Sequence, residues 1–461
     1  MARPFVFGTS REAFRSQLRT TPHLASLWQK GPGGTLNCTR SMPMEIGSRQ
    51  EIFAAAAQNP GRAPVRVAQT VAYAKALARF YRYGLGAAWR NIKTARALRR
   101  QYVLSPWVDR AGDAGAISLP RFRVLARAMA QAIYMDKMEG DKVRKTQRSE
   151  KTETTDTEKA KTETTDTEKA KTGAQPAKTE AIVTTPESFS TENSETAKGT
   201  EATGAEATVS DAEVAKTPSE ATLSGESVVP SGESVVLSGE GVLFSLARRD
   251  FQLLRRAPPD AAKLPLFALV ATLLGELTPL ICYAVPEIMP STCCLPSLLP
   301  RVWRAAPLEN VRTLVRAQPP DAYAQKTAFA LPPAHVRALC SALRLKARYI
   351  PSWMYPEKVL RQRLQDHYNY LCVDDFYLSG HNGDGNVWSL TPQEVVLACL
   401  ERNLGGDVRQ LVSGTEPERR ERLVQWRLKL VQYLANAPAA NVGYLGVAAL
   451  MEAPRAEIAR W

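Results

Sequence analysis

The sequence is poor in the residues that build most catalytic and metal centres. Its 461 residues include four histidines and seven cysteines, and the cysteines are scattered without a C-x-x-C pair. This pattern argues against a disulfide scaffold and against a zinc site of the usual spacing. A glycine-rich phosphate loop and the G-x-S-x-G and H-E-x-x-H motifs are also missing. We therefore expect no enzymatic activity, no bound metal and no cofactor.

Negative charge is scarce outside a single stretch of the chain. Residues 150–240 contain 19 acidic residues and eight lysines, a net charge of −11, whereas the whole chain carries +14. The remainder of the chain therefore carries +25. Such an excess indicates an anionic partner, either nucleic acid or an acidic membrane surface.

The acidic stretch belongs to a predicted disordered, low-complexity insert over residues 143–240. The decapeptide KTETTDTEKA occurs twice in tandem, and SGESVV occurs twice further on. Repeats of this kind bury too little apolar surface to offset the entropy of the chain. The insert could be a neutral spacer, a lure for a basic partner or a mask for the basic parts of the chain, and composition favours the spacer.

Residues 1–44 contain one acidic residue, Glu12. Their positive charges are Arg3, Arg11, Arg15, Arg19, Lys30 and Arg40. This composition is typical of a mitochondrial transit peptide, which needs positive charge and an apolar face but no stable fold. A disordered basic tail is the alternative.

A basic amphipathic helical region is predicted over residues 64–142. Residues 52–108 contain ten Lys and Arg and no acidic residue. Apolar residues recur there at helical spacing: Val67, Val71, Ala74, Ala78, Tyr81, Leu85 and Ile92. The cationic face suits anionic lipids or RNA phosphates, and the alternative is an ordinary helix packed on its domain. A second helix is expected over residues 122–138, after Pro120.

The most apolar stretch, residues 264–285, contains a single charged residue, Glu276. As one helix it would be about 33 Å long, enough to cross a bilayer core of about 30 Å. A short helix ended by Pro258 and Pro259 is expected to precede it within a unit over residues 244–300. A buried helix of a soluble protein is the alternative. A mid-span carboxyl group costs about 3 kcal/mol, so Glu276 is a functional candidate, or else a residue that only fixes helix packing.

Residues 301–461 are predicted to form a helical domain, in which two helices start at capping boxes with proline in the first position, at Thr391 and Thr415. Asp374 and Asp375 are interpreted as capping and turn residues, with acid–base chemistry as the alternative. Five cations near the start of the domain are candidate RNA contacts, or else a solvated helix face: Arg344, Lys346, Arg348, Arg361 and Arg363.

Two blocks of sequence resemble the LETM family, named for a leucine zipper, an EF-hand and a transmembrane segment. The first block contains LARRDFQLLRR, LPLF, GELTPL and PEIMPSTC, between residues 246 and 293. The second contains YIPSWMYP and LCVDDFYLSGHNGDGNVWSLTPQEVVLACLERN, between residues 349 and 403. Ala247 replaces the family's Ser or Thr, and Asn403 replaces a Gly after Arg402. The EF-hand and the long coiled coil are missing, which weakens a calcium-linked role.

The resemblance implies an all-α, single-pass protein of the mitochondrial inner membrane. Its C-terminal domain would be a LETM-type ribosome-binding domain in the matrix. Its partners would be the mitochondrial ribosome, with its rRNA and proteins, and inner-membrane lipids, and it would support membrane insertion of nascent chains. One alternative is monovalent cation/proton exchange for ion and volume homeostasis, with Glu276 as the proton carrier in a homo-oligomer. Another is a purely structural membrane tether.

Overall fold

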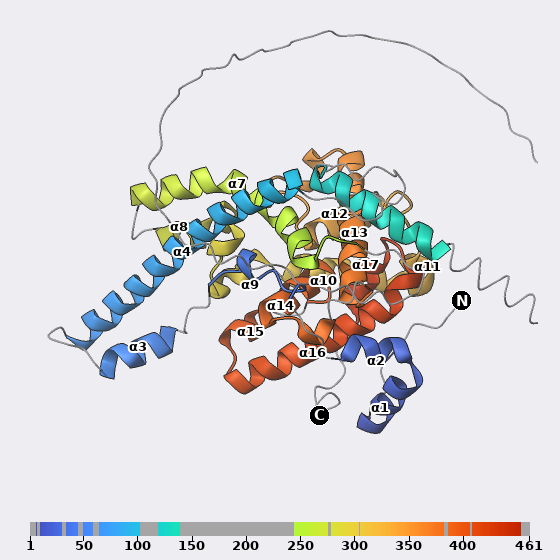
Figure 1. Ribbon diagram of the computed structural model, residues 1–461, viewed down its shortest axis with the longest axis horizontal. Coiled ribbons are helices and arrows are strands. Elements are labelled where there is room, and N and C mark those ends of the chain that lie inside the picture. The colour runs from blue at the N-terminus through green and yellow to red at the C-terminus, as the bar shows by residue number, and fades with distance from the viewer. Residues whose placement is uncertain are drawn as a thin grey trace, which may run out of the picture. The chain divides into compact units, whose positions relative to one another are not determined.

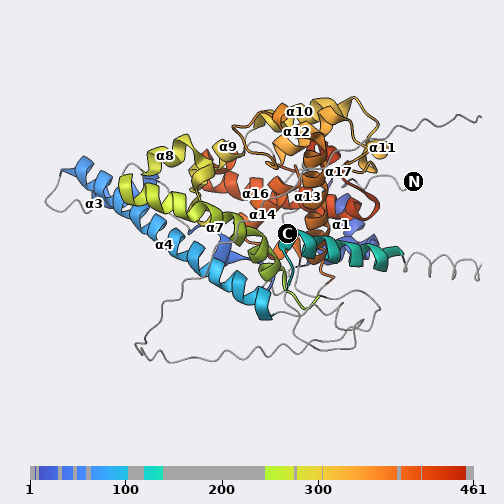
Figure 2. The same cartoon turned by 90° about the horizontal axis from the view of Figure 1, so that it is seen from above.

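The protein is described by a computed structural model (Figures 1 and 2). The described residues are 6, 10–29, 34–44, 49–58, 64–101, 119–138, 244–274, 278–303, 305–381, 386–405 and 408–452. Within these ranges the chain forms α-helices and 3-10 turns and no strand, so the predicted all-α class is confirmed. The predicted insert, residues 143–240, and Glu276 lie outside the described residues.

The helices before the insert are α1 (Arg11–Thr20), α2 (Pro22–Trp28), α3 (Arg49–Gln58), α4 (Val65–Gln101) and one over residues 122–138, as predicted. Those after it are α7 (Arg248–Leu274), α8 (Thr278–Ala284), α9 (Leu299–Val302), α10 (Ala305–Arg316), α11 (Pro320–Ala324), α12 (Pro333–Ala342), α13 (Glu357–Leu378), α14 (Pro392–Glu401), α15 (Arg409–Ser413), α16 (Glu416–Asn436) and α17 (Tyr444–Val447). Single 3-10 turns join them: η1 (Thr39–Ser41), η4 (Pro286–Ile288), η5 (Ser291–Cys293), η6 (Pro296–Leu298), η7 (Ser352–Met354), η8 (Val387–Ser389), η9 (Ala437–Ala439) and η10 (Ala448–Leu450).

The main core surrounds α13, which lies in the middle of the C-terminal helices (Figure 1). Side chains along its whole length are buried, from Leu360 to Tyr377. Phe251 of α7 stacks on Tyr370 of α13, with ring centroids 5.8 Å apart. The C-terminal helices therefore share one core with α7 and with the N-terminal helices.

The predicted transit segment, residues 1–44, contributes side chains to this core. Phe14 and Leu27 are fully buried, and the Leu36 carbonyl accepts a hydrogen bond of 2.8 Å from Arg248 Nη1. The expectation that this segment needs no stable fold is wrong for its described residues. Its role in targeting stays a prediction.

Two helices start at the threonines that the sequence indicates. Thr415 and Glu418 form the complete capping box, with the Glu418 carboxylate accepting from Thr415 N at 2.9 Å. Thr391 Oγ1 accepts from Glu394 N at 3.4 Å, but the Glu394 side chain is buried among arginines and does not cap the helix. The first capping box is therefore only half formed.

The residue after α14 has a left-handed backbone. Asn403 has a φ of 60°, which asparagine adopts more readily than most residues with a side chain. Its Nδ2 donates to the Leu445 carbonyl at 3.0 Å. Asparagine thus takes the place of the glycine that the LETM motif has here.

Asp374 is the centre of a buried charge network that joins α7 to α13 and to the end of α14. Its carboxylate accepts from Arg248 Nε at 2.7 Å, from Gln252 Nε2 at 2.6 Å and from Arg402 Nη2 at 2.6 Å. Burial alone would raise the pKa of Asp374, but the adjacent guanidinium groups lower it well below its usual value. Asp374 and Asp375 lie inside α13, so their interpretation as capping and turn residues is wrong.

A second carboxylate ties the N-terminal segment to α7. Glu394 Oε1 accepts from Arg256 Nη1 at 3.0 Å and from the backbone N of Cys38 at 3.2 Å. Its other oxygen lies 3.4 Å from Arg248 Nη1. The Glu394 side chain therefore bridges three segments that are far apart in the sequence.

A third part of the network surrounds Arg255. This guanidinium group lies over the Tyr370 ring, 3.3 Å from its centroid, and pairs with Glu401 at 3.0 Å. The Tyr370 hydroxyl donates to the same carboxylate at 2.8 Å. His367 lies beside them, with Nε2 2.8 Å from the Glu401 carbonyl and Nδ1 3.4 Å from Arg255 Nη2.

The network contains four arginines and four carboxylates: Arg248, Arg255, Arg256, Arg402, Asp374, Asp375, Glu394 and Glu401. Equal numbers of opposite charges, each in an ion pair, make burial tolerable, whereas removal of a single partner leaves a charge uncompensated. The geometry offers no free acid or base, because each carboxylate is held by an arginine.

α7 continues through Pro258, Pro259 and Pro265, and the expectation that the first two end a helix is wrong. Each proline removes one backbone hydrogen bond and disfavours a helix interior by about 3 kcal/mol. The helix is held on both sides of the first two prolines, by Arg256 in the charge network and by Asp260. Of the described helices, α7 is long and apolar enough to cross a membrane.

The chain leaves the body on α7 and returns after α8 to the place where it left. Ser291 N donates to Asp260 Oδ1 at 2.8 Å, and Lys263 Nζ donates to the Met289 carbonyl at 3.3 Å. Side chains of α7 and α8 also share a buried cluster. The two helices therefore form a hairpin, and the prediction of one helix over residues 264–285 is wrong.

The first prediction concerns the centre of the charge network. Asp374→Asn should lower the free energy of unfolding by about 3–5 kcal/mol, because Arg248 and Arg402 lose the charge that compensates them. Urea unfolding of the purified full chain in detergent, followed by circular dichroism, measures this. The matched control is Glu416→Gln, whose exposed pairs with Arg419 and Arg420 should contribute less than about 1 kcal/mol. Equal stability of the two variants would contradict the prediction.

The second prediction concerns acid. Burial, and then the Arg255 charge, lower the pKa of His367 to about 4. An unfolded imidazole titrates near pH 6.5, so between these values the unfolded state alone binds the proton. The stability contributed by neutral His367 is present above pH 6.5 and falls by about 3 kcal/mol as the pH approaches 4. His367→Gln should remove that part of the loss.

The difference in unfolding free energy between wild type and His367→Gln isolates the contribution of the His367 imidazole to the pH dependence. Burial raises the pKa of Asp375 to about 6, an effect of opposite sign in the same pH range. Both proteins keep Asp375, so its contribution cancels in the difference. Unfolding free energies measured between pH 7.5 and 4.5 that change in parallel in the two proteins would disprove the assignment.

Candidate nucleic-acid interface

α4 has one buried face and one cationic face. The buried face contains Phe80, Gly84, Ala88, Asn91 and Ala95, which follow one another at steps of three or four. Tyr81 and Ile92 are buried as predicted, whereas Val67 and Val71 are exposed. The alternative, an ordinary helix packed on its domain, is therefore correct for the second half of α4. The face of α4 that is buried, however, is rotated about the helix axis from the face that the sequence predicts.

Close backbone contact fixes α4 against η5. The Gly84 carbonyl accepts from Thr292 Oγ1 at 2.9 Å. A Cβ atom at Gly84 would lie 2.6 Å from Cys293 Sγ and 2.9 Å from the Thr292 carbonyl oxygen. Asn91 Nδ2 further donates to the Arg40 carbonyl at 2.8 Å. A glycine at this position is therefore needed for α4 to approach so closely.

The opposite face of α4 carries seven exposed cations: Lys75, Arg79, Arg82, Arg90, Lys93, Arg96 and Arg100. Steps of three, four and eight residues place them on one side of the helix. At 1.5 Å per residue, the row is about 38 Å long. α4 and α7 lie side by side in both views (Figures 1 and 2), and the seven cations remain exposed beside this contact.

No carboxylate of the described residues pairs with these seven cations. Two exposed aromatic rings lie among them. Lys93 Nζ is 5.5 Å from the Trp89 ring centroid, and the Arg90 guanidinium is 5.9 Å from that of Tyr83. Uncompensated cations with interspersed aromatic rings are the features that bind RNA phosphates and unstacked bases.

Of the five cations predicted from the C-terminal domain, three lie between α12 and α13 and two lie in the first turns of α13, and all five are engaged within the chain. Arg361 pairs with Glu357, with Nε 2.7 Å from Oε1, and donates to two backbone carbonyls. Arg363 donates to the Leu345 carbonyl at 3.0 Å. These two side chains hold the start of α13, and their contact with RNA stays a prediction.

The other three predicted cations surround the turn before η7. Arg344 lies over the Trp303 ring, 5.3 Å from its centroid. Lys346 Nζ donates to the Ile350 carbonyl at 3.3 Å, and Arg348 lies 3.9 Å from Glu287. The structure thus brings them together around a turn and not on an open helix face.

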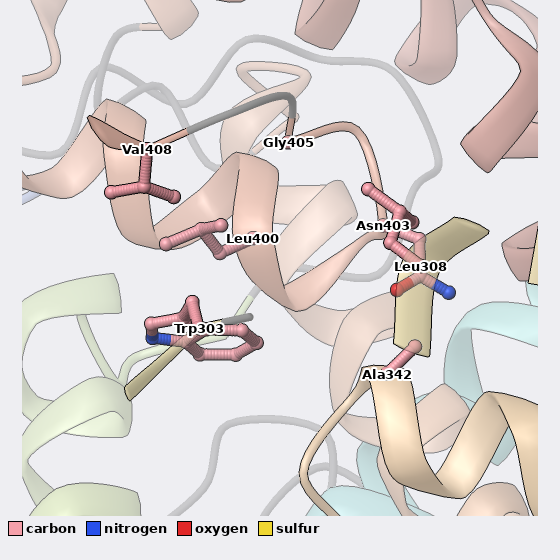
Figure 3. A pocket seen from close by; sticks show the side chains of 7 residues that line it. All are labelled: Trp303, Leu308, Ala342, Leu400, Asn403, Gly405 and Val408. Atoms are coloured by element: carbon pink, nitrogen blue, oxygen red, sulfur yellow. The ribbon is translucent and has the colours of Figure 1, made fainter. Parts of the chain in front are cut away.

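A small pocket lies between α9, α10 and α14 (Figure 3). Its lining residues are Trp303, Leu308, Ala342, Leu400, Asn403, Gly405 and Val408. A cavity volume of about 20 Å³ holds roughly one water molecule. Its amide side chain, Asn403, already donates to the Leu445 carbonyl. The described residues also contain no cluster of three His, Cys, Asp or Glu side chains fit for a metal ion.

The third prediction tests the seating of α4. Gly84→Ala should destabilise the full chain by about 1–3 kcal/mol, because the added methyl group overlaps Thr292 and Cys293. Gly86→Ala is the control, since its Cβ would meet only the flexible end of Arg90. That change should be neutral or stabilise the helix by up to about 1 kcal/mol. Thermal unfolding in detergent measures both, and a stable Gly84→Ala variant would contradict the packing.

Residues 237–381 match the family model described as the pentamidine resistance factor domain. The matched segment includes α7, the hairpin and the whole of α13, and it covers less than half of the chain. This family is associated with the mitochondrial membrane, and it is not the LETM family that the sequence motifs resemble. No curated protein and no solved structure matches the chain. The chain thus contains, at residues 237–381, a segment similar to the pentamidine resistance factor domain.

Proposed function

We propose that this chain is a protein of the mitochondrial inner membrane that binds mitochondrial ribosomes from the matrix side. The cationic face of α4 is the docking surface, and binding holds ribosomes where nascent chains enter the membrane. The observation that carries the proposal is the row of seven cations on a helix packed against α7, a row that no carboxylate of the described residues compensates.

The chemistry of α4 suits a nucleic-acid surface. A row about 38 Å long reaches several phosphates of an RNA helix or strand. Each cation that contacts a phosphate releases condensed counterions, which gives sequence-independent affinity and a steep dependence on salt. Trp89 and Tyr83 are half-exposed and can stack on unpaired bases. The proposed role is docking and needs no catalytic group.

Two further observations support a membrane location in mitochondria. The family matched by residues 237–381 is associated with the mitochondrial membrane, and α7 is apolar enough to enter a bilayer. The choice of the ribosome among RNA partners comes from the resemblance of the two sequence blocks to the LETM family. Because α4 packs along α7, a ribosome bound to α4 would be held close to the membrane.

The fourth prediction tests this docking. Full-length protein in detergent is sedimented with mitochondrial ribosomes between about 50 and 300 mM salt. The logarithm of the binding constant should fall linearly with the logarithm of the salt concentration, with a slope of about 0.7–0.9 for each phosphate contact. The double variant Arg90→Gln, Lys93→Gln should bind more weakly, and its log–log salt slope should fall by roughly 1.4–1.8.

The control removes the same charge elsewhere. Arg419 and Arg420 pair with Glu416 on the exposed surface of α16, and replacing both with Gln should leave the slope unchanged. A third variant, Lys346→Gln with Arg348→Gln, tests the cations indicated by the sequence. The proposal is abandoned if wild-type protein does not sediment with ribosomes at the lowest salt, or if the α4 variant loses only binding to anionic vesicles.

A further inference from the structure

The part of α7 that can enter a membrane is shorter than the helix. Arg248 and Arg256 are fixed in the charge network, and Asp260 is buried against Ser291. Of the described residues of α7, the 14 from 261 to Leu274 extend beyond these contacts. At 1.5 Å per residue they reach about 21 Å, less than the 30 Å or so of a bilayer core.

The contacts at the base of the hairpin fix the direction of return. Asp260 and Ser291 are bonded through both the backbone N and the hydroxyl of the serine. Lys263 reaches the Met289 carbonyl beside them. The chain that leaves at Asp260 is therefore back at the same level thirty-one residues later, which a helix that crosses to the other side cannot achieve.

The hairpin exposes large apolar side chains on both helices. On α7 these are Leu266, Leu269 and Leu273, the last of which is 74% exposed. On α8 they are Leu280 and Tyr283. Apolar surface of this extent on the outside of one element marks a contact with lipid or with another molecule. Among the described residues of α7 beyond Asp260 and of α8, Lys263, at the base, is the only charged residue, which is the pattern expected of a segment that enters lipid.

A second apolar surface lies next to the base of the hairpin. Tyr349, Ile350, Trp353 and Met354 are exposed, and Trp353 reaches 76%. The Tyr349 hydroxyl lies 3.5 Å from the carbonyl of Ala284, the last residue of α8. The two surfaces are therefore continuous.

Cations and aromatic rings alternate at this level. Arg301 lies over the Tyr283 ring, 3.7 Å from its centroid, and Arg348 lies near both Tyr349 and Glu287. Tryptophan, tyrosine and arginine together are typical of the boundary between lipid headgroups and acyl chains. The aromatic and cationic side chains at the base of the hairpin thus indicate that the membrane surface lies at the level of these residues.

We infer that α7 beyond Asp260 and α8 enter one leaflet as a hairpin and leave on the side they entered, while residues 349–354 lie in the headgroup region beside them. The occupant of this surface is the lipid bilayer. The inference uses the membrane attachment in the proposed function but not ribosome binding, so the two can fail separately.

Membrane topology provides the first test. One epitope tag is placed within residues 180–220 and a second after Trp461 of the full chain, and mitoplasts are treated with protease. Both tags should be protected in intact mitoplasts and digested after detergent is added. A helix that crosses once would place the tags on opposite sides, so digestion of one tag alone in intact mitoplasts overturns the inference.

Quenching of tryptophan fluorescence provides the second test. Full-length protein is reconstituted in vesicles of phosphatidylcholine brominated near the headgroup. Trp353→Phe should lose a quenched component of the wild-type emission. The control Trp388→Phe should keep that component, because Trp388 packs on Trp28 within the body. Equal quenching in Trp353→Phe and wild type would show that residues 349–354 lie outside the membrane. That result would overturn this part of the inference.

Discussion

The buried charge network centred on Asp374 determines how the rest of the chain is placed. It links α7, α13 and the end of α14, and through Glu394 it also holds the segment that contains Cys38. A network of this kind contributes little net stability compared with an apolar core, but it tolerates only one arrangement, because any slip leaves a buried charge unpaired. This constraint holds α7 in register through two consecutive prolines, and α7 in turn positions α4 and the hairpin.

The placement of α7 gives the protein two surfaces of opposite character. The hairpin and the turn over residues 349–354 expose apolar and aromatic side chains, whereas α4 exposes a row of cations. The aspartate at the base of the hairpin separates the buried half of α7 from the exposed half. In the proposed function the apolar surface contacts lipid and the cationic row contacts RNA, and neither role requires catalytic chemistry.

Sequence reasoning found the cationic helix but not its orientation. The absence of acidic residues from 52–108 indicated the row on α4, whereas the apolar spacing pointed to a face rotated from the buried one, since alanines and Gly84 carry little hydrophobic signal. In the sequence, Arg361 and Arg90 both stand as cations of a basic segment. Only the fold shows that Arg361 is bonded to Glu357 and to backbone carbonyls. The paired aspartates resembled turn residues because their arginine partners are distant in the chain.

The sequence by itself determined the helical class, the second helix over residues 122–138, the helix starts at Thr391 and Thr415, the apolar segment and the basic helix. These features depend on periodicity and on neighbours within a few residues. Only the tertiary structure decided that Arg248 meets Asp374, 126 residues away, that the apolar segment folds back to Asp260, and that residues 10–29 and 34–44 contribute side chains to the core. Buried charges select their partners by position in space, and a sequence carries no local signal for a contact that chain folding creates.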